Sequence, residues 1–204
     1  KYSWAHLGLG FTLAQEGQSA KAEAEYKEAI QLNPNVASSH GYLGYLLADQ
    51  SKYSEAEAEF REAARLDDKQ AEWHARLGSV LIDQQKYTEG QAESEQAIQL
   101  DPKNPTPHIN LGNILYQQRK YPEAEVEYRQ AVQLDGNNWA AHYDLGLALE
   151  QQAKYDGAVT ELGEAVKIEP GNTAAQQSLQ RATQERENAQ LLNQSPESFT
   201  PSQH

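Results

Sequence analysis

The apolar side chains of this chain recur at helical spacing, in short runs separated by polar segments. Within residues 37–50, Leu43, Leu46 and Leu47 fall on one helical face, and within residues 55–66 alanines and a phenylalanine do the same. Many of the remaining positions in both stretches are polar. The pattern therefore predicts a pair of short amphipathic helices, each of which buries one face.

A leucine–glycine pair marks the first helix of each predicted pair and returns every 34 residues. It occurs as Leu9-Gly10, Leu43-Gly44, Leu77-Gly78, Leu111-Gly112 and Leu145-Gly146. An alanine keeps the same register at Ala29, Ala63, Ala97, Ala131 and Ala165. Such a period is the signature of a tandem array in which each repeat packs against its neighbours. The sequence therefore predicts five copies of one helix pair, without a single globular core.

Small residues stand where the two helices of a pair would cross. Gly44 on the first helix and Ala56 on the second leave room for close packing, which offsets the roughly 1 kcal/mol that a glycine costs inside a helix. Ser54 and Thr88 each precede a glutamate or glutamine by three residues, which is capping-box spacing. We therefore expect the second helices of units two and three to begin at these residues.

These coincident positions resemble the tetratricopeptide repeat family, whose pattern runs Leu-Gly, a small residue, an aromatic residue, an alanine and a proline. The aromatic and proline positions are Tyr53, Tyr87, Tyr121, Tyr155, Pro34, Pro102 and Pro170. The resemblance covers residues 3–172, in units 3–36, 37–70, 71–104, 105–138 and 139–172. It implies an all-α fold, an α-solenoid of stacked helix-turn-helix repeats that form a right-handed superhelix.

Two further segments follow the fifth unit. Within residues 173–192, Ala175, Leu179 and Ala182 form one apolar stripe, and the rest is polar, which predicts a solvating end helix. Residues 193–204 are polar, contain two prolines and lack periodicity, so we expect a flexible tail.

The net charge of -13 excludes some partners. Much of it lies on the second helices, as Glu25, Glu59, Glu93, Glu127 and Glu161 in one row and Glu23, Glu57 and Glu125 in another. In the family these helices form the outer, convex side, so we interpret both rows as a solvated face, with a docking strip for a basic partner as the alternative. Nucleic acid is disfavoured, because it requires clustered lysine and arginine.

Other compositional features leave the location of the protein open. The chain has no cysteine, which excludes disulfides and thiolate metal sites but suits reducing and oxidising compartments alike, with the cytoplasm slightly favoured. No apolar run reaches the length of a membrane span, and no signal peptide is present, so we expect no direct membrane insertion. The absence of methionine suggests a segment excised from a longer protein.

Five histidines share one slot of the repeat: His6, His40, His74, His108 and His142. Zinc binds nitrogen ligands at about 2.0–2.1 Å, whereas the same slot in neighbouring repeats is separated by about 8–10 Å or more. One metal ion therefore cannot bind two of them. We expect structural, half-buried histidines, no metal site and no cofactor.

Catalytic motifs are missing from the sequence. There is no Gly-x-Ser-x-Gly turn, no phosphate-binding loop and no His-Glu-x-x-His, and Gly8-Leu9-Gly10 lies inside a repeat. We therefore expect no enzymatic activity, and keep open that the chain is a regulatory domain of a larger protein.

The resemblance also implies where a ligand binds, because the family holds peptides on its concave face through the first helix of each unit. The corresponding residues here are Leu7, Phe11 and Gln15; Tyr45 and Asp49; Ser79, Ile82 and Asp83; Ile109, Asn113, Tyr116 and Gln117; and Tyr143, Leu147 and Gln151. These slots are aromatic and mildly acidic. They imply a protein or peptide partner with hydrophobic anchors and basic residues.

Some co-chaperones of the family grip C-terminal carboxylates with lysines on this face. The fifth slots of the five units here hold Leu7, Gly41, Ala75, Ile109 and Tyr143, and none is a lysine. That clamp is therefore absent, and we expect acidic C-terminal tails to be rejected. Arg76 borders the face and is the nearest group that would bind a carboxylate.

Two functions remain open. The first is a scaffold or adaptor that binds a partner's peptide or helix in the groove, as an assembly factor for a larger complex. The second is a self-associating module, in which apolar residues such as Trp4, Leu7 and Phe11 pack on another copy, giving a homo-oligomer.

Unit three departs from the other units. Gly90 replaces the alanine of the small-residue slot, and Ser94 replaces the large residue seen as Tyr26, Phe60, Tyr128 and Leu162. Its second helix thus loses helical propensity and a core side chain together. We expect this helix to be the least stable of the second helices.

Overall fold

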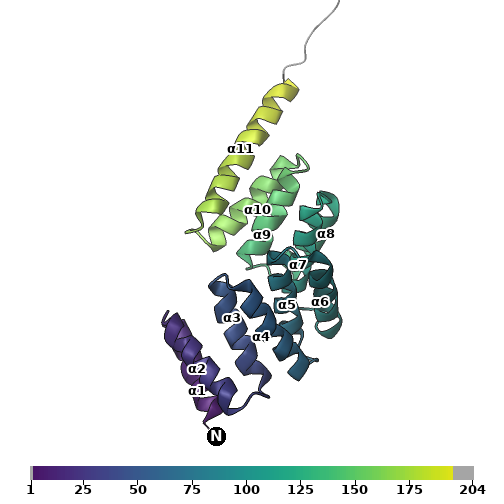
Figure 1. The fold of residues 1–204 in the computed structure, drawn as a ribbon. Helices are drawn as coiled ribbons and strands as arrows, with labels where there is room; N and C mark the ends of the chain where they lie inside the picture. Colours follow the sequence, from purple (N-terminus) through teal and green to yellow (C-terminus); the bar gives the residue numbers. More distant parts are fainter. Residues whose placement is uncertain (1, 195–204) are drawn as a thin grey trace, which may run out of the picture. The chain divides into compact units, whose positions relative to one another are not determined.

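The computed structural model describes residues 2–194, and in this part of the chain every regular element is a helix (Figure 1). The helices are α1 (Ser3–Gln15), α2 (Ser19–Leu32), α3 (Ala37–Asp49), α4 (Tyr53–Leu66), α5 (Ala71–Asp83), α6 (Tyr87–Leu100), α7 (Thr106–Gln117), α8 (Tyr121–Leu134), α9 (Trp139–Glu150), α10 (Tyr155–Ile168) and α11 (Thr173–Gln194). They form two compact units, each larger than the 34-residue repeats described above: Lys1–Ile114, here called unit 1, and Leu115–His204, here called unit 2. Helix α7 contributes residues to both.

Helices that follow one another in the chain pack together. In unit 1, α1 contacts α2, α3 contacts α4 and α5 contacts α6, while α2 contacts α3 and α4 contacts α5. In unit 2, α9 contacts both α8 and α10, and α10 contacts α11. The predicted all-α helical repeat fold is confirmed. Because α1 also contacts α3 directly, these first helices of neighbouring pairs lie side by side.

In three leucine–glycine pairs, those with Gly10, Gly44 and Gly146, the glycine accommodates a large side chain from the second helix. A Cβ at Gly10 would lie 2.7 Å from the ring of Tyr26, and one at Gly44 would lie 3.0 Å from the ring of Phe60. Real Cβ atoms do not approach other atoms so closely, because interiors are already packed to crystal density. The predicted close packing at these glycines is therefore confirmed.

The helix pair α5–α6 closes in a different way. A Cβ at Gly78 would lie 2.7 Å from the Ser94 hydroxyl and 3.2 Å from the backbone oxygen of Gly90. One at Gly90 would lie 2.9 Å from the side chain of Ile82. Ser94 is fully buried, and its hydroxyl donates to the Gly90 carbonyl at 2.8 Å. The missing core side chain is thus compensated by closer approach of the two helices, and lower stability of α6 stays a prediction.

The starts of the second helices differ from the prediction. α4 begins at Tyr53 and α6 at Tyr87, so Ser54 and Thr88 lie inside the first turn and make no capping bond. The preceding turn is instead closed by Ser51, whose φ of 59° is left-handed, and by a backbone bond of 2.9 Å from the Lys52 N–H to a carbonyl of α3. This is a Schellman motif, which ends one helix and sets the start of the next. The capping-box prediction was therefore wrong.

The end helix α11 packs on α10 through a narrow stripe. Ala175, Ser178 and Ala182 are buried, and most of the other side chains up to residue 192 are at least partly exposed. No helix among the described residues is long and apolar enough to cross a membrane. The predicted flexible tail falls almost entirely on residues 195–204, which lie outside the described residues.

Candidate functional site

Two adjoining hollows lie along the first helices of unit 1. The first has a volume of about 320 Å³ and is lined by Phe11, Ala14, Gln15, Ser19, Tyr26, Tyr42, Tyr45, Leu46 and Asp49. The second has a volume of about 240 Å³ and is lined by Tyr45, Ala48, Asp49, Tyr53, Phe60, Arg76, Ser79, Val80 and Asp83. Both hollows share Tyr45 and Asp49, so they lie next to each other over α1, α3 and α5; together they are here called the unit 1 groove.

Aromatic rings in mutual contact form the walls of this groove. The ring centroid of Tyr42 lies 5.7 Å from that of Phe11 and 6.1 Å from that of Tyr26. Tyr45 continues the series, at 6.4 Å from Tyr42 and 5.4 Å from Phe60. Such contacts hold each ring in place, so the walls are preorganised and a ligand need not order them.

Tyr45 also belongs to a polar cluster with Glu72 and Arg76. Its hydroxyl donates to the Glu72 carboxylate, and Arg76 Nε donates to the same carboxylate at 2.8 Å and to the hydroxyl oxygen at 3.0 Å. The guanidinium carbon of Arg76 lies 4.9 Å from the centroid of the Tyr45 ring. One arginine thus makes an ion pair and a cation–π contact together.

The charges within this cluster offset each other. Burial acts to raise the pKa of Glu72, yet the bond from Tyr45 and the charge of Arg76 outweigh it and hold that pKa below its ordinary value. Burial and the bond to Glu72 raise the pKa of the Tyr45 hydroxyl. Glu72 is therefore ionised, and its charge is offset by Arg76.

Asp49 and Asp83 have no such partner. Both side chains are exposed, and neither makes an ion pair or a side-chain hydrogen bond with any residue between 2 and 194. Loss of water around Asp83 raises the pKa of its carboxyl. These two carboxylates therefore give the groove its negative charge.

Six of the eight predicted site residues on α1, α3 and α5 line the groove: Phe11, Gln15, Tyr45, Asp49, Ser79 and Asp83. The other two do not. Leu7 is only 6% exposed and belongs to the core of unit 1. Ile82 is half-buried and packs towards Gly90 of α6.

Two further residues depart from the expected inner face. Gly41, assigned there by its slot, is buried, and a Cβ at this position would overlap the ring of Trp73. Tyr42, which follows it, was not predicted and lines the first hollow. The sequence did contain a signal for Tyr42: among the sixth residues of the five repeats, it is the one aromatic residue.

The remaining predicted residues lie on α7 and α9. Ile109 and Asn113 are half-buried on the part of α7 that belongs to unit 1. In unit 2 the ring of Tyr116 lies 5.2 Å from that of Tyr121, and the ring of Tyr143 lies 6.2 Å from that of Trp139. Leu147 is half-buried, and Gln117 and Gln151 are exposed. A role of these residues in binding stays a prediction.

The glutamates of the second helices are engaged within the protein. Glu57 accepts hydrogen bonds from Arg61 of its own helix at 2.9 Å, and from Gln84 at 2.8 Å and Lys86 at 2.6 Å in the next repeat. Burial acts to raise the pKa of Glu57, but these three donors outweigh it and lower the pKa to about 2. Glu125 repeats the arrangement with Arg129, Gln152 and Lys154.

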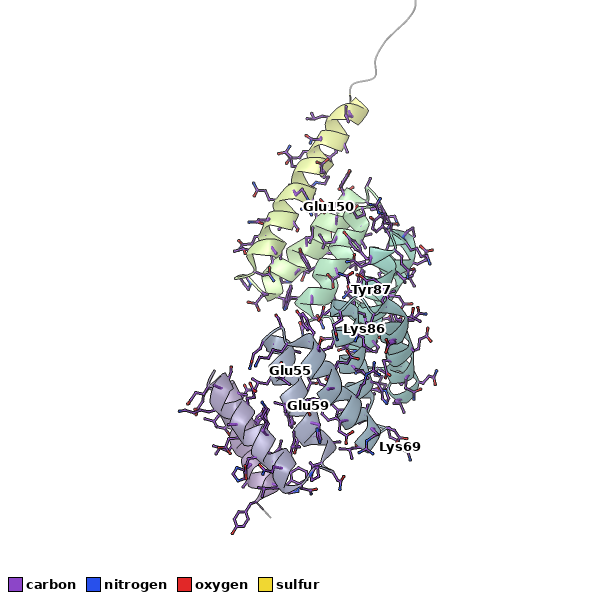
Figure 2. The ribbon with its side chains drawn as sticks, in the orientation of Figure 1. Glu55, Glu59, Lys69, Lys86, Tyr87 and Glu150 are labelled. Carbon is purple, nitrogen blue, oxygen red and sulfur yellow. The ribbon has the colours of Figure 1, made fainter. Side chains whose placement is uncertain are left out.

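The other glutamate row pairs with the histidines. The Nδ1 atom of His40 lies 2.7 Å from Oε2 of Glu59, which is labelled in Figure 2. The same pairing recurs at His6–Glu25, His74–Glu93 and His142–Glu161. The Nε2 atom of His40 lies 3.0 Å from the carbonyl oxygen of Pro34, in the turn between repeats. Each pair thus joins the two helices of one repeat. The interpretation of both glutamate rows as a solvated face was therefore wrong for these members.

Comparison with known families agrees with this architecture. A model described as "Tetratricopeptide repeat" matches residues 7–71, one described as "TPR repeat" matches residues 78–119 and 112–153, and a further "Tetratricopeptide repeat" model matches residues 140–172. No curated protein matches the chain significantly.

Solved structures share the fold at low sequence identity. The pilF protein of Pseudomonas aeruginosa has a TM-score of 0.75 and 22% identity over 97% of this chain and 93% of its own. A thermophilic TPR protein from Thermus thermophilus has a TM-score of 0.75 and 14% identity over 89% of this chain and 99% of its own. YrrB has a TM-score of 0.59 and 20% identity over 85% of this chain and 89% of its own. The chain belongs to the tetratricopeptide repeat family.

Proposed function

We propose that this protein is a scaffold that binds a segment of a partner protein in the unit 1 groove. The observation that carries the proposal is the groove itself, in which preorganised aromatic walls surround two carboxylates that lack a cationic partner among residues 2–194. Aromatic side chains supply contact area at small entropic cost. One structural relative, YrrB, has an unusual peptide-binding site, which supports a binding role.

The position of the two carboxylates supports a ligand-directed role. Asp49 and Asp83 are the last residues of α3 and α5, where the helix dipole is negative. A carboxylate at a helix C-terminus destabilises the helix by about 0.3–1 kcal/mol. A basic group from a partner would offset this repulsion. The proposed partner segment therefore carries basic residues together with hydrophobic anchors.

The experiment compares matched basic and acidic peptides, each with the same hydrophobic anchors, at low and physiological salt. We expect preferential capture of the basic set, weaker binding at higher salt, and loss of binding in Tyr45→Ala and in the double variant Asp49→Asn/Asp83→Asn. The matched control is Asp67→Asn, which removes an exposed carboxylate just after α4 and outside both hollows.

The opposite preference would overturn the proposal. If acidic peptides bind better, and Arg76→Ala weakens them, the groove is a carboxylate site built around Arg76. Equal capture of both peptide sets by the wild-type protein and by the double variant would also exclude the proposed role of the carboxylates.

One observation favours self-association as a second candidate. Tyr2 is 76% exposed and Trp4 on α1 is 62% exposed, so a large aromatic surface faces solvent at the beginning of unit 1. Such surface marks many interaction sites. Mass in solution measured against concentration tests this function. A dimer that Trp4→Ser abolishes supports it, and a monomer at all concentrations excludes it.

A further inference from the structure

The two hollows of the unit 1 groove differ in one component. The second hollow contains a cation of the chain itself, because Arg76 lies over the Tyr45 ring and bonds to Glu72. The first hollow contains rings and a carboxylate, but its lining includes no lysine, arginine or histidine. In the second hollow, an arginine thus contacts an aromatic ring and a carboxylate together. The first hollow has aromatic rings and a carboxylate but no cation.

The surfaces of the first hollow suit a flat cation. Phe11 and Tyr42 meet edge to face, with an interplanar angle of 61°, so the hollow presents both ring edges and ring faces. Asp49 stands at the end of α3 and lines the same hollow. A guanidinium group stacks on aromatic faces and is more weakly hydrated than an ammonium group, so it enters such a site at lower desolvation cost.

We propose that the first hollow is a subsite for an arginine side chain of the partner segment, with the guanidinium between the aromatic rings and the Asp49 carboxylate. This inference rests on the proposed function, since it assigns one residue of the partner segment to one place in the unit 1 groove. In the second hollow the guanidinium of Arg76 already lies over the Tyr45 ring, so an adjacent residue of the partner segment, and not this arginine, would bind there.

The test uses a small probe, so that it does not depend on finding the partner. Nα-acetyl-arginine amide is titrated into isotope-labelled full-length protein and followed by NMR, beside the uncharged isostere Nα-acetyl-citrulline amide and the leucine and lysine analogues. We expect saturable shifts at residues of the first hollow such as Gln15 and Leu46, and binding about tenfold weaker for citrulline. Lysine is expected to bind more weakly than arginine.

Variants separate the subsite from general charge effects. Asp49→Asn is expected to abolish the preference for arginine over citrulline, whereas Asp67→Asn, an identical change in charge just after α4 and outside both hollows, leaves it intact. Tyr42→Leu keeps an apolar side chain and removes a ring, so it should weaken arginine and leave leucine amide unaffected. Circular dichroism verifies that each variant is folded.

The outcomes distinguish this inference from the proposed function. Equal affinity for arginine and citrulline, tighter binding of leucine, or an unchanged preference in Asp49→Asn overturns the arginine subsite, even where longer basic peptides still bind in the groove. A different result is that Nα-acetyl-arginine amide shifts the resonances of the first hollow as expected while no peptide is captured. That result leaves the subsite standing and removes the proposed function.

Discussion

Two carboxylates at the ends of first helices and two on second helices have opposite surroundings in this protein. On the second helices, Glu57 and Glu125 each accept hydrogen bonds from three side chains, two of which come from the next repeat. On the first helices, Asp49 and Asp83 make no such bond with any residue in the described range, although they lie at the unfavourable end of a helix dipole. The net charge therefore combines carboxylates that hold repeats together with carboxylates that are available to a ligand.

The comparison shows why charge alone is a poor guide to a docking surface. The repeated glutamate rows are the most regular acidic feature of the sequence, yet most of their described members are paired within the protein with lysine, arginine or histidine. In unit 2, Glu150 (labelled in Figure 2) is likewise bound by Arg181, at 2.6 and 2.7 Å. Unpaired carboxylates beside aromatic rings are the more informative feature.

The largest effect on stability is expected when a histidine that pairs with a second-helix glutamate is removed. His40 is 8% exposed and faces two acceptors, Glu59 and the Pro34 carbonyl. His40→Ala should lower the free energy of unfolding by roughly 2–3 kcal/mol, because it removes packing and leaves both acceptors unsatisfied. Urea denaturation measures this, with His204→Ala, outside the repeats, as the control.

The same pair provides a pH test. The bond to Glu59 raises the pKa of His40 above its ordinary value, so the protonated form is favoured in the folded state. Its contribution to stability is complete below the unfolded pKa of about 6.5 and is lost as pH rises through the higher folded pKa. The difference between wild type and His40→Ala should therefore shrink from pH 6 to pH 9. A difference that grows with pH would contradict the assigned bond.

Asp144 on α9 sharpens the comparison, because it is a first-helix carboxylate that differs from Asp49 and Asp83 in being largely withdrawn from solvent. Burial raises the pKa of Asp144 to about 7. Since the folded pKa exceeds the unfolded value, stability should fall as pH rises from about 4 to above 7. Asp144→Asn should remove this fall and stabilise the protein by roughly 2 kcal/mol at pH 8. A shift of three pKa units corresponds to about 4 kcal/mol, and we expect about half of it because the Asp144 side chain is partly exposed to solvent.

The control for Asp144 is the same substitution at an exposed site. Asp156→Asn, at an exposed position of α10, makes the same change in charge without removing a buried carboxyl. Thermal unfolding at pH 5 and pH 8 distinguishes the two variants. Equal stability of wild type and Asp144→Asn at both pH values would mean that Asp144 titrates as an ordinary surface carboxyl.

A smaller loss is expected when a cross-repeat acceptor is changed. Glu57→Gln should destabilise the protein by about 1 kcal/mol at pH 7, because the ion pairs with Arg61 and Lys86 are lost. The pKa of Glu57 is lowered to about 2, so its contribution is present above the unfolded pKa of about 4.5 and lost as pH falls through about 2. Glu55→Gln, an exposed neighbour on α4, is the matched control.

The smallest effect on stability is expected in the groove. Asp49→Asn should be neutral or stabilise by a few tenths of a kcal/mol, since it removes a negative charge from a helix C-terminus and breaks no bond within the described chain. The same variant should bind basic peptides more weakly. A loss of more than about 1 kcal/mol would show that Asp49 has a structural partner and would erase the contrast with Glu57.

Several features followed from the sequence alone. The period, the helix pairs and the glycine at each crossing were readable, because close packing of neighbouring helices requires a small residue at a fixed place in every copy. Gln15, Asp49 and Asp83 were also expected on the inner face, since they stand in the same slot near the ends of α1, α3 and α5, and all three line the hollows. Periodicity assigns a residue to a helix face, and for these exposed residues the face alone predicts that they line the inner surface.

Only the tertiary structure decided which side chains in those slots are available. Leu7 and Ile82 occupy groove slots but pack into the protein, and Gly41 is covered by Trp73. Glu57 meets Lys86, which is 29 residues further along the chain, and this pairing depends on how two repeats stack. A periodic pattern shows which residues share a slot, but it does not show which side chain of the next repeat each of them meets. The engaged and the free carboxylates can therefore be separated only when the contacts between repeats are known.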